Sequence, residues 1–163
     1  MMDWKSIIDN EWTLFLDRDG VINVRIIDGY VTNIEDFKFL PNVVTNQQGV
    51  GKGIMTNEDV RNVHRYMVQE IESKGGKIDG VYFCPQLKSA PDNYRKPSPM
   101  MAYYAKNEFP DIDLQKSIMV GDMNSDVEFG KNAGMKTIFV GDNELTLTPD
   151  DRFNTLYDFA KTL

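Results

Sequence analysis

The chain has 163 residues, 41% of them hydrophobic and 26% charged, which is typical of one soluble globular domain with a sizeable core. Its formal net charge of −7 argues against binding of nucleic acid or of an anionic membrane, because both require a basic face. A single cysteine, Cys84, excludes an intrachain disulfide, and the segment before Trp12 has no long apolar run that would predict a signal peptide or a membrane anchor. We therefore expect a cytoplasmic protein with a single domain over residues 1–163.

Short apolar runs alternate with amphipathic helical segments along the chain. Strands are predicted at residues 12–16, 78–84, 117–120 and 136–140, with a short stub at 43–44. Helices are predicted from the cap residue Thr56 to Gly75, from the cap residue Ser98 to Pro110, over 125–133 and over the tail 149–163. This order predicts an α/β fold with a Rossmann-like, doubly wound, mostly parallel sheet and helices on both of its faces.

Two carboxylates follow the first predicted strand, in the sequence "FLDRDG". Asp17 and Asp19 point the same way if the extended geometry of the strand persists, because side chains alternate along a strand. Two like charges at this spacing repel, and each raises the pKa of the other. We therefore expect a positive charge between them, or a proton on one of them.

Two other strand ends are also polar, and in an open α/β sheet ligands bind beyond the carboxyl ends of the strands. Thr45 and Asn46, followed by several glycines, offer a hydroxyl and main-chain amides that suit phosphate oxygens. Asp122 follows the strand "SIMVG" and would bind a hard cation such as Mg²⁺ together with Asp17. Arg95 and Lys96 precede a proline that opens a helix, and the Lys96 ammonium, fixed near the strand ends, could neutralise a phosphate and Asp17 together. Taken singly, the first and last of these features also fit an ordinary turn and a solvated lysine. Asp126, four residues after Asp122, also fits an acid in the first turn of a helix, where the helix dipole stabilises it.

Together, these residue types favour phosphoryl transfer. A carboxylate nucleophile at Asp17 could attack phosphorus and form an aspartyl-phosphate, while Asp19 acts as the general acid and then as the general base. Mg²⁺, Lys96 and Thr45 would stabilise the charge on the transferring group.

Four short motifs occur in order between about Thr13 and Val140, and they resemble those of the haloacid-dehalogenase-like (HAD) phosphatases: "DRDG", "VVTN", "RKP" and "VGDMNSD". Within this superfamily, "FLDRDGVINV" and "TNQQGVGKG" are most similar to the heptose-bisphosphate and histidinol-phosphate phosphatase branch. The resemblance implies a fold with little or no cap domain, and a small flap at Tyr30 and Val31 beside the entrance. It also implies Asp17 as the nucleophile and Asp19 as the acid/base. It implies that Mg²⁺ is bound by Asp17, Asp122 and the main-chain carbonyl of Asp19. The implied phosphate ligands are Thr45, Asn46 and Lys96, and Arg95 would reach the substrate.

The sequence departs from the branch at its structural zinc loop, which reads Cys-x-His and later Cys-x-Cys in many members. Here Cys84 is kept, but Gln86 stands at the histidine position, and Asp92 and Tyr94 stand at the later cysteines. A structural zinc ion needs about four ligands, usually thiolates and imidazoles. We therefore predict that no zinc binds and that Cys84 is a small buried hydrophobic residue.

A second departure lies between the flap and the second motif, where the family has a whole helix and most of a strand. The sequence "FLPNVVTN" offers only two apolar residues there, although parallel strands need a helix-length connection. We therefore expect that residues are missing between Asn42 and Val43.

Three functions fit these residues. The favoured one is a Mg²⁺-dependent phosphatase of a small phosphorylated metabolite, with a heptose 1,7-bisphosphate ahead of histidinol phosphate or another small sugar phosphate. A phosphotransferase or mutase would need a cap large enough to exclude water, and a non-catalytic phosphate-binding module would not need an acid/base at Asp19. We expect a monomer that binds neither nucleic acid nor a membrane, and we expect His64 to be packed in the core rather than catalytic.

Overall fold

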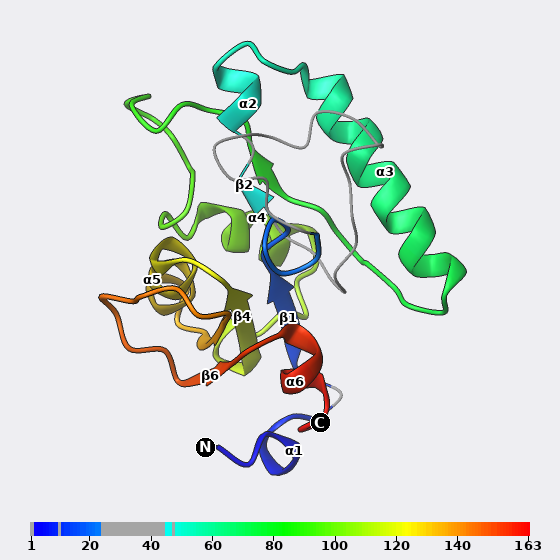
Figure 1. The fold of residues 1–163 in the computed structure, drawn as a ribbon, viewed down its shortest axis with the longest axis vertical. Helices are drawn as coiled ribbons and strands as arrows, with labels where there is room; N and C mark the ends of the chain where they lie inside the picture. The colour runs from blue at the N-terminus through cyan, green and yellow to red at the C-terminus, as the bar shows by residue number, and fades with distance from the viewer. Residues whose placement is uncertain (1, 10, 24–44, 47) are drawn as a thin grey trace.

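The computed structural model describes residues 2–9, 11–23, 45–46 and 48–163 (Figure 1). Its helices are α1 (Trp4–Ile7), α2 (Gln48–Gly51), α3 (Asn57–Ser73), α4 (Met100–Glu108), α5 (Asn124–Ala133) and α6 (Leu156–Ala160), with a short 3₁₀ turn at Leu114–Lys116. Its strands are β1 (Thr13–Leu16), β2 (Thr45–Asn46), β3 (Phe83–Cys84), β4 (Ser117–Gly121), β5 (Lys136–Val140) and β6 (Asp151–Phe153).

The main sheet has four parallel strands in the order β1-β4-β5-β6. β2 and β3 form a separate parallel pair, in which Thr45 lies opposite Phe83. Leu16 of β1 pairs with Val120 of β4, so these two strands end side by side. The residues that follow β1 and β4 therefore emerge at the same edge of the sheet, which is where α/β proteins bind their ligands.

The two faces of the main sheet are buried by different helices, because side chains alternate along each strand. One face packs against α1 and α6, and its core includes Leu16, Val120, Ile138 and Phe159. The opposite face packs against α4 and α5, and its core includes Phe15, Met119 and Phe129. The predicted doubly wound α/β fold is confirmed, and no cap domain is present in the described part of the chain.

Helix α3 begins and ends where its sequence signals predict. The hydroxyl of Thr56 accepts a hydrogen bond from the Asp59 N–H at 3.1 Å, and the Asp59 carboxylate accepts one from the Thr56 N–H at 2.7 Å. This reciprocal capping box satisfies two N–H groups that a helix start otherwise leaves unpaired. The helix buries the stripe Val60, Val63, His64 and Met67.

The tail was predicted as one helix, and this prediction is wrong. Residues 151–153 form β6, which pairs with β5, and only 156–160 are helical. The Asp150 carboxylate, which resembles a helix start in sequence, instead accepts hydrogen bonds from the N–H and hydroxyl of Thr137, both at 2.9 Å. The helix begins later, where Thr155 accepts a hydrogen bond from the Asp158 N–H.

Two smaller differences from the predicted elements concern boundaries. α4 is capped by Pro99 and not by Ser98, and the strand predicted at 78–84 is limited to Phe83–Cys84. The stub at 43–44, the flap residues Tyr30 and Val31, and the junction between Asn42 and Val43 lie outside the described residues. Within the described ranges, no helix has both the length and the apolar character that crossing a membrane requires.

Candidate active site

The loop after β1 is a tight turn that begins with Asp17. The Asp17 N–H donates to the Val120 carbonyl at 2.9 Å, so β1 remains paired with β4 up to this residue. The Arg18 carbonyl then accepts hydrogen bonds from three successive N–H groups, those of Val21, Ile22 and Asn23. Gly20 takes a φ of +94°, which favours glycine. The sequence "DRDGVIN" therefore returns on itself and fixes Asp17 at the end of the strand.

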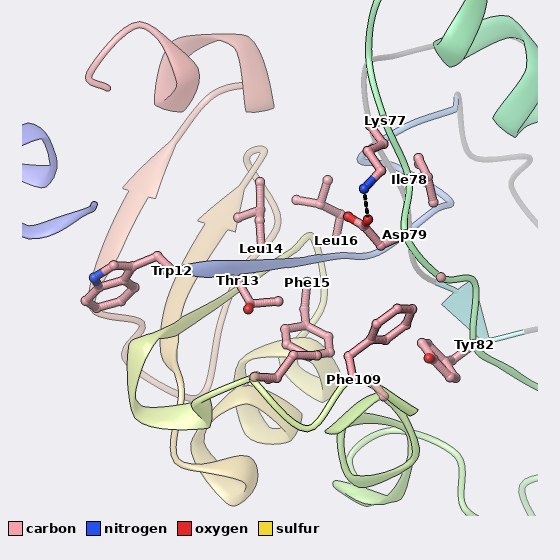
Figure 2. Close-up of a pocket in the computed structure, with 13 residues that line it drawn as sticks. Trp12, Thr13, Leu14, Phe15, Leu16, Lys77, Ile78, Asp79, Tyr82 and Phe109 are labelled. Atoms are coloured by element: carbon pink, nitrogen blue, oxygen red, sulfur yellow. Dashed lines mark ion pairs between the residues drawn. The ribbon is translucent and has the colours of Figure 1, made fainter. Parts of the chain in front are cut away.

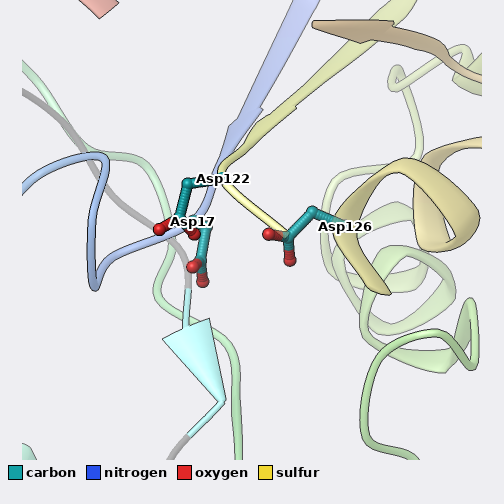
Figure 3. A group of neighbouring side chains, drawn as sticks. All are labelled: Asp17, Asp122 and Asp126. Atoms are coloured by element: carbon teal, nitrogen blue, oxygen red, sulfur yellow. The ribbon is translucent and has the colours of Figure 1, made fainter. Parts of the chain in front are cut away.

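Three buried carboxylates meet at the ends of β1 and β4. Oxygen atoms of Asp17, Asp122 and Asp126 all lie within 4.8 Å of one another (Figure 3). Asp17 follows β1, Asp122 follows β4, and Asp126 comes from the first turn of α5. All three residues are at most 6% exposed. The predicted meeting of Asp17 with Asp122 at one sheet edge is thus a feature of the structure.

Two glycines leave the space that these carboxylates occupy. A Cβ added to Gly20 would lie 2.0 Å from Asp122 Oδ2, and a Cβ added to Gly121 would lie 2.1 Å from the Asp126 Cβ. No real Cβ makes such contacts, so any larger residue at either position would displace a carboxylate or the backbone. The glycines of "DRDG" and "VGD" are therefore part of the architecture of the acid cluster.

Lys96 inserts its ammonium group between two of the three carboxylates. Its Nζ lies 2.6 Å from Asp17 Oδ1 and 2.6 Å from Asp126 Oδ1, and its side chain is 1% exposed. Burial lowers the pKa of Lys96, but the charges of Asp126 and Asp17 together raise it by more, so the pKa lies above its ordinary value. Lys96 is therefore a buried cation that links the end of β1 to the start of α5.

Asp126 belongs to the site, although its sequence position suggested only a helix-terminus acid. Its Oδ2 accepts a hydrogen bond from the Met123 N–H at 3.0 Å, which is the capping contact, while its Oδ1 faces Lys96. The Asp126 carboxylate thus caps α5 and also pairs with Lys96. The spacing of Asp122 and Asp126 was visible in the sequence, but nothing there indicated that Lys96 would reach Asp126.

The charge balance of this cluster favours a bound cation. The pKa of Asp17 is raised to about 8, chiefly by burial and also by the charges of Asp126, Asp122 and Asp19, against the opposing effect of Lys96. A divalent cation beside Asp17 and Asp122 would offset this repulsion and restore the ionised carboxylate. The donors are all oxygen atoms, which Mg²⁺ prefers. The residues present therefore fit a magnesium site.

Asp19 lies at the outer side of this cluster and is held by Arg18. The Arg18 Nη2 donates to both Asp19 carboxylate oxygens, at 2.9 and 3.0 Å, and the Asn23 amide donates to Asp19 Oδ1 at 2.8 Å. The Asp19 side chain is 24% exposed, whereas Arg18 is fully buried. Asp19 is thus oriented by two donors and remains accessible from solvent.

Arg18 also contacts His64 of α3, which the sequence assigned to the core. The distance from Arg18 Nη1 to His64 Nε2 is 3.4 Å, and Nε2 must be the acceptor because a guanidinium only donates. Burial, and then the charge of Arg18, lower the pKa of His64 to about 3, so the ring is neutral. The ring packs against Phe83 with centroids 5.4 Å apart, which confirms the predicted packing role. The contact with Arg18 was not predicted.

The remaining predicted site residues are described only in part. Thr45 and Asn46 form β2, but their side chains lie outside the described part of the structure. Arg95 directly precedes Lys96 and is half-buried, and its backbone N–H donates to Asn93 Oδ1 at 3.2 Å. Its Nη1 is buried without a hydrogen-bond partner among the described residues, so this guanidinium can still donate to a ligand.

Comparison with known proteins identifies the family. A family model described as HAD-hyrolase-like matches residues 93–155. The D-glycero-alpha-D-manno-heptose-1,7-bisphosphate 7-phosphatase of Mycobacterium tuberculosis (strain CDC 1551 / Oshkosh) is 36% identical over 172 residues, which cover 93% of this chain and 90% of the relative. The chain belongs to the heptose-1,7-bisphosphate 7-phosphatase family. It is therefore a HAD phosphatase, as the four motifs predicted.

Two further members of this phosphatase family are informative. The D-glycero-beta-D-manno-heptose-1,7-bisphosphate 7-phosphatase of Rhodopseudomonas palustris is 37% identical over 144 residues, covering 74% of this chain and 78% of the relative. The crystal structure of the D,D-heptose 1,7-bisphosphate phosphatase from B. bronchiseptica has a TM-score of 0.72 and 27% identity, covering 78% of this chain and 80% of that one. That structure is complexed with magnesium and phosphate.

In this phosphatase, the Gln86 side-chain amide organises the loop from Cys84 to Tyr94, for which we predicted no zinc. The Gln86 Oε1 accepts hydrogen bonds from the Tyr94 N–H at 3.2 Å and from the Cys84 thiol at 3.6 Å, and Gln86 Nε2 donates to the Asp92 carbonyl at 3.4 Å. Cys84 is fully buried, which confirms its predicted packing role. Gln86 thus connects both ends of the loop that leads to Arg95, and the absence of zinc stays a prediction.

Proposed function

We propose that this phosphatase removes the 7-phosphate of a D-glycero-D-manno-heptose 1,7-bisphosphate with Mg²⁺ as its cofactor. The observation that carries the proposal is the buried cluster of Asp17, Asp122 and Asp126 around Lys96, at the carboxyl ends of two parallel strands. The substrate is taken from the relatives, which are named for this activity. This chain aligns with most of the length of each of them.

The first step transfers the phosphoryl group to the protein. A carboxylate oxygen of Asp17 attacks phosphorus, the bond from phosphorus to the sugar oxygen breaks, and Asp19 donates a proton to that leaving oxygen. The exposure of Asp19 supports this role, because a general acid must reach the leaving oxygen of the substrate. The products of the step are the sugar alcohol and an aspartyl-phosphate at Asp17.

The second step returns Asp17 to its starting state. Asp19, now ionised, takes a proton from water, and the resulting hydroxide attacks the phosphorus of the aspartyl-phosphate. The bond from phosphorus to the Asp17 oxygen breaks, and inorganic phosphate leaves. Arg18 and Asn23 support this step because they hold the Asp19 carboxylate in one orientation by charge-assisted hydrogen bonds.

The phosphate is bound by cationic and polar groups on two segments. We assign phosphate binding to Thr45, Asn46 and Lys96, and contact with the rest of the substrate to Arg95. The metal ligands are the carboxylates of Asp17 and Asp122 and the main-chain carbonyl of Asp19. When bound, Mg²⁺ supplies charge stabilisation for the phosphoryl oxygens. The buried Nζ of Lys96 neutralises the nucleophile and the transferring group together.

We also assign the whole chain, residues 1–163, to one domain that acts as a cytoplasmic monomer on a small phosphorylated metabolite. The anomer of the heptose is left to experiment, because the relatives include both the alpha and the beta specificity. Histidinol phosphate or another small sugar phosphate is the second candidate substrate, since the four motifs are shared by that branch.

The test is phosphate release with Mg²⁺ from both anomers of the heptose 1,7-bisphosphate, the two heptose monophosphates, histidinol phosphate and common sugar phosphates. Wild type and Asp17→Asn are compared, with an added acceptor alcohol to detect phosphoryl transfer. We expect one bisphosphate to be preferred, with the 1-phosphate product retained, and activity to be lost in Asp17→Asn. A preference for histidinol phosphate would replace the substrate assignment, and phosphorylated acceptor would indicate a phosphotransferase. No release by a folded, Mg²⁺-bound protein would favour a binding module.

A further inference from the structure

Helix α3 packs against the turn that carries the acid/base Asp19. Alongside β1, residues of that strand and of the segment 77–82, which follows α3, line a cavity of about 370 Å³ (Figure 2). Beyond the carboxyl end of β1, Ile22 of the turn forms a fully buried apolar cluster with Val63 and Met67 of α3. The helix and the turn therefore share a core next to the candidate active site.

Arg18 connects this helix to the acid/base. Its side chain is fully buried, its Nε donates to Asp19 Oδ1 at 3.2 Å, and its Nη2 donates to both Asp19 carboxylate oxygens, at 2.9 and 3.0 Å. On the other side of the same group, Nη1 faces His64 Nε2 at 3.4 Å. One planar guanidinium thus extends from the acid/base to helix α3.

The His64 ring is held in place as the acceptor of this contact. A guanidinium only donates, so Nε2 accepts and the ring proton lies on Nδ1. Burial, and then the charge of Arg18, lower the pKa of His64 to about 3, so the ring stays neutral and keeps this lone pair at neutral pH. The ring is 6% exposed on the buried stripe of α3, and it packs edge-on against Phe83 of β3. Two elements therefore fix the acceptor.

The orientation of the Arg18 guanidinium decides the orientation of the Asp19 carboxylate. Because a guanidinium is rigid and planar, a contact at Nη1 sets the direction in which Nε and Nη2 point. Here these two nitrogens face both oxygens of Asp19, whereas the Asn23 amide contacts only Oδ1. Charge-assisted contacts to both oxygens fix the plane of a carboxylate as well as its position.

We propose that His64 is a positioning residue for catalysis: it fixes the Arg18 guanidinium, which in turn fixes the plane of the Asp19 carboxylate. The inference rests on the proposed role of Asp19 as acid/base. His64 acts through Arg18 and is itself neither the acid nor the base. Asp19 donates a proton in the first step of the reaction and takes one in the second, so loss of its orientation slows both steps.

The kinetic test compares His64→Leu, which removes the acceptor at similar volume, with His64→Gln, which keeps one. Val63→Ala is the matched control, because it weakens the same buried face of α3 and leaves the contact with Arg18. General acid–base catalysis contributes about 10²–10⁴-fold, and we expect His64→Leu to lose about 10-fold of it in kcat, with KM changed less than about twofold. His64→Gln should recover most of kcat, and Val63→Ala should lower Tm while keeping kcat.

Three results would overturn the positioning role. They are a wild-type kcat in His64→Leu, equal losses of kcat in His64→Leu and His64→Gln, and a loss in Val63→Ala as large as that in His64→Leu. The first of these, with an active wild type, refutes the inference and leaves the proposed function intact. A wild type that hydrolyses no phosphate ester would remove the proposed function and this inference with it.

A second readout needs no turnover. The Arg18 Nε–H donates to Asp19, and its NMR signal is assigned by its loss in Arg18→Lys. We expect this signal to be sharp and to exchange slowly with water in wild type and His64→Gln, and to broaden or exchange rapidly in His64→Leu. An Arg18 signal that is unchanged in His64→Leu would refute the positioning role, whatever the activity of that variant.

Discussion

Replacing Lys96 by methionine removes the buried cation while keeping most of the side-chain volume. The Lys96 ammonium lies 2.6 Å from both Asp17 and Asp126, and the three side chains are 1%, 7% and 2% exposed. Removing one partner of a buried ion pair leaves an uncompensated charge and costs about 3–5 kcal/mol. We therefore expect Lys96→Met to lower the free energy of unfolding by about 3–5 kcal/mol in the absence of divalent metal.

The loss should depend on pH in a defined direction. The pKa of Asp17 already lies near 8, and removal of the lysine charge raises it further. In the unfolded chain the pKa of this carboxyl is 3.8, so above that pH the folded variant keeps a proton that the unfolded chain has released. A folded state that binds more protons than the unfolded state loses stability as the pH rises. Wild type shares this slope until Asp17 ionises near pH 8, so the deficit of Lys96→Met should stay nearly constant between pH 5 and 7 and grow above pH 8.

The assay is urea unfolding with EDTA and again with saturating Mg²⁺, with Lys136→Met as the matched control. Lys136 contacts Asp150 at 3.1 Å, but the two side chains are 40% and 23% exposed, so we expect a loss within about 1 kcal/mol. Added Mg²⁺ should stabilise Lys96→Met at least as much as wild type, because it replaces part of the lost positive charge. If Lys96→Met costs no more than Lys136→Met, the electrostatic account of the cluster is wrong.

Two further predictions follow from buried groups near the site. The pKa of His64 is about 3 in the folded protein against 6.5 in the unfolded chain, so stability is lost as the pH falls, by about 2 kcal/mol between pH 7 and 5. His64→Gln keeps an acceptor for Arg18 and should lack this loss in urea unfolding; an unchanged pH dependence would contradict it. Gly20→Ala should displace Asp122 and so weaken Mg²⁺ binding, measured by calorimetry, about 10–100-fold. Gly75 also has a positive φ, but no atom lies within 4 Å of an added Cβ there, so Gly75→Ala should affect stability alone. Equal metal affinity in both glycine variants would refute the role of Gly20.

The site could be predicted from the sequence where a local rule decides the position. Asp17 and Asp122 each follow an apolar run, and parallel strands bring such positions to one edge, so their meeting needed no long-range information. The cap at Thr56 and the stop at Gly134, with φ of +80°, are likewise local. Each of these features is determined by residues within a few positions of it in the sequence.

Contacts between distant residues could not be predicted in this way. The contact between Arg18 and His64 joins residues 46 positions apart, and His64 alone looks like any residue of an apolar helical stripe. β6 was mistaken for helix because Asp150 and Asp151 resemble a helix start, while the pairing with β5 that makes it a strand is non-local. The role of Asp126 was hidden for a related reason: its capping contact is local, but its ion pair with Lys96 is not.

The central claim is that Asp17 carries the phosphoryl group during turnover. It is tested by acid quench of the Mg²⁺-loaded enzyme during hydrolysis of the preferred heptose bisphosphate, followed by mapping of the phosphorylated peptide. The account predicts phosphate on Asp17 that hydroxylamine releases, and neither phosphate nor turnover in Asp17→Asn. Phosphate on another residue, or an Asp17→Asn variant that turns over at the wild-type rate, would contradict it.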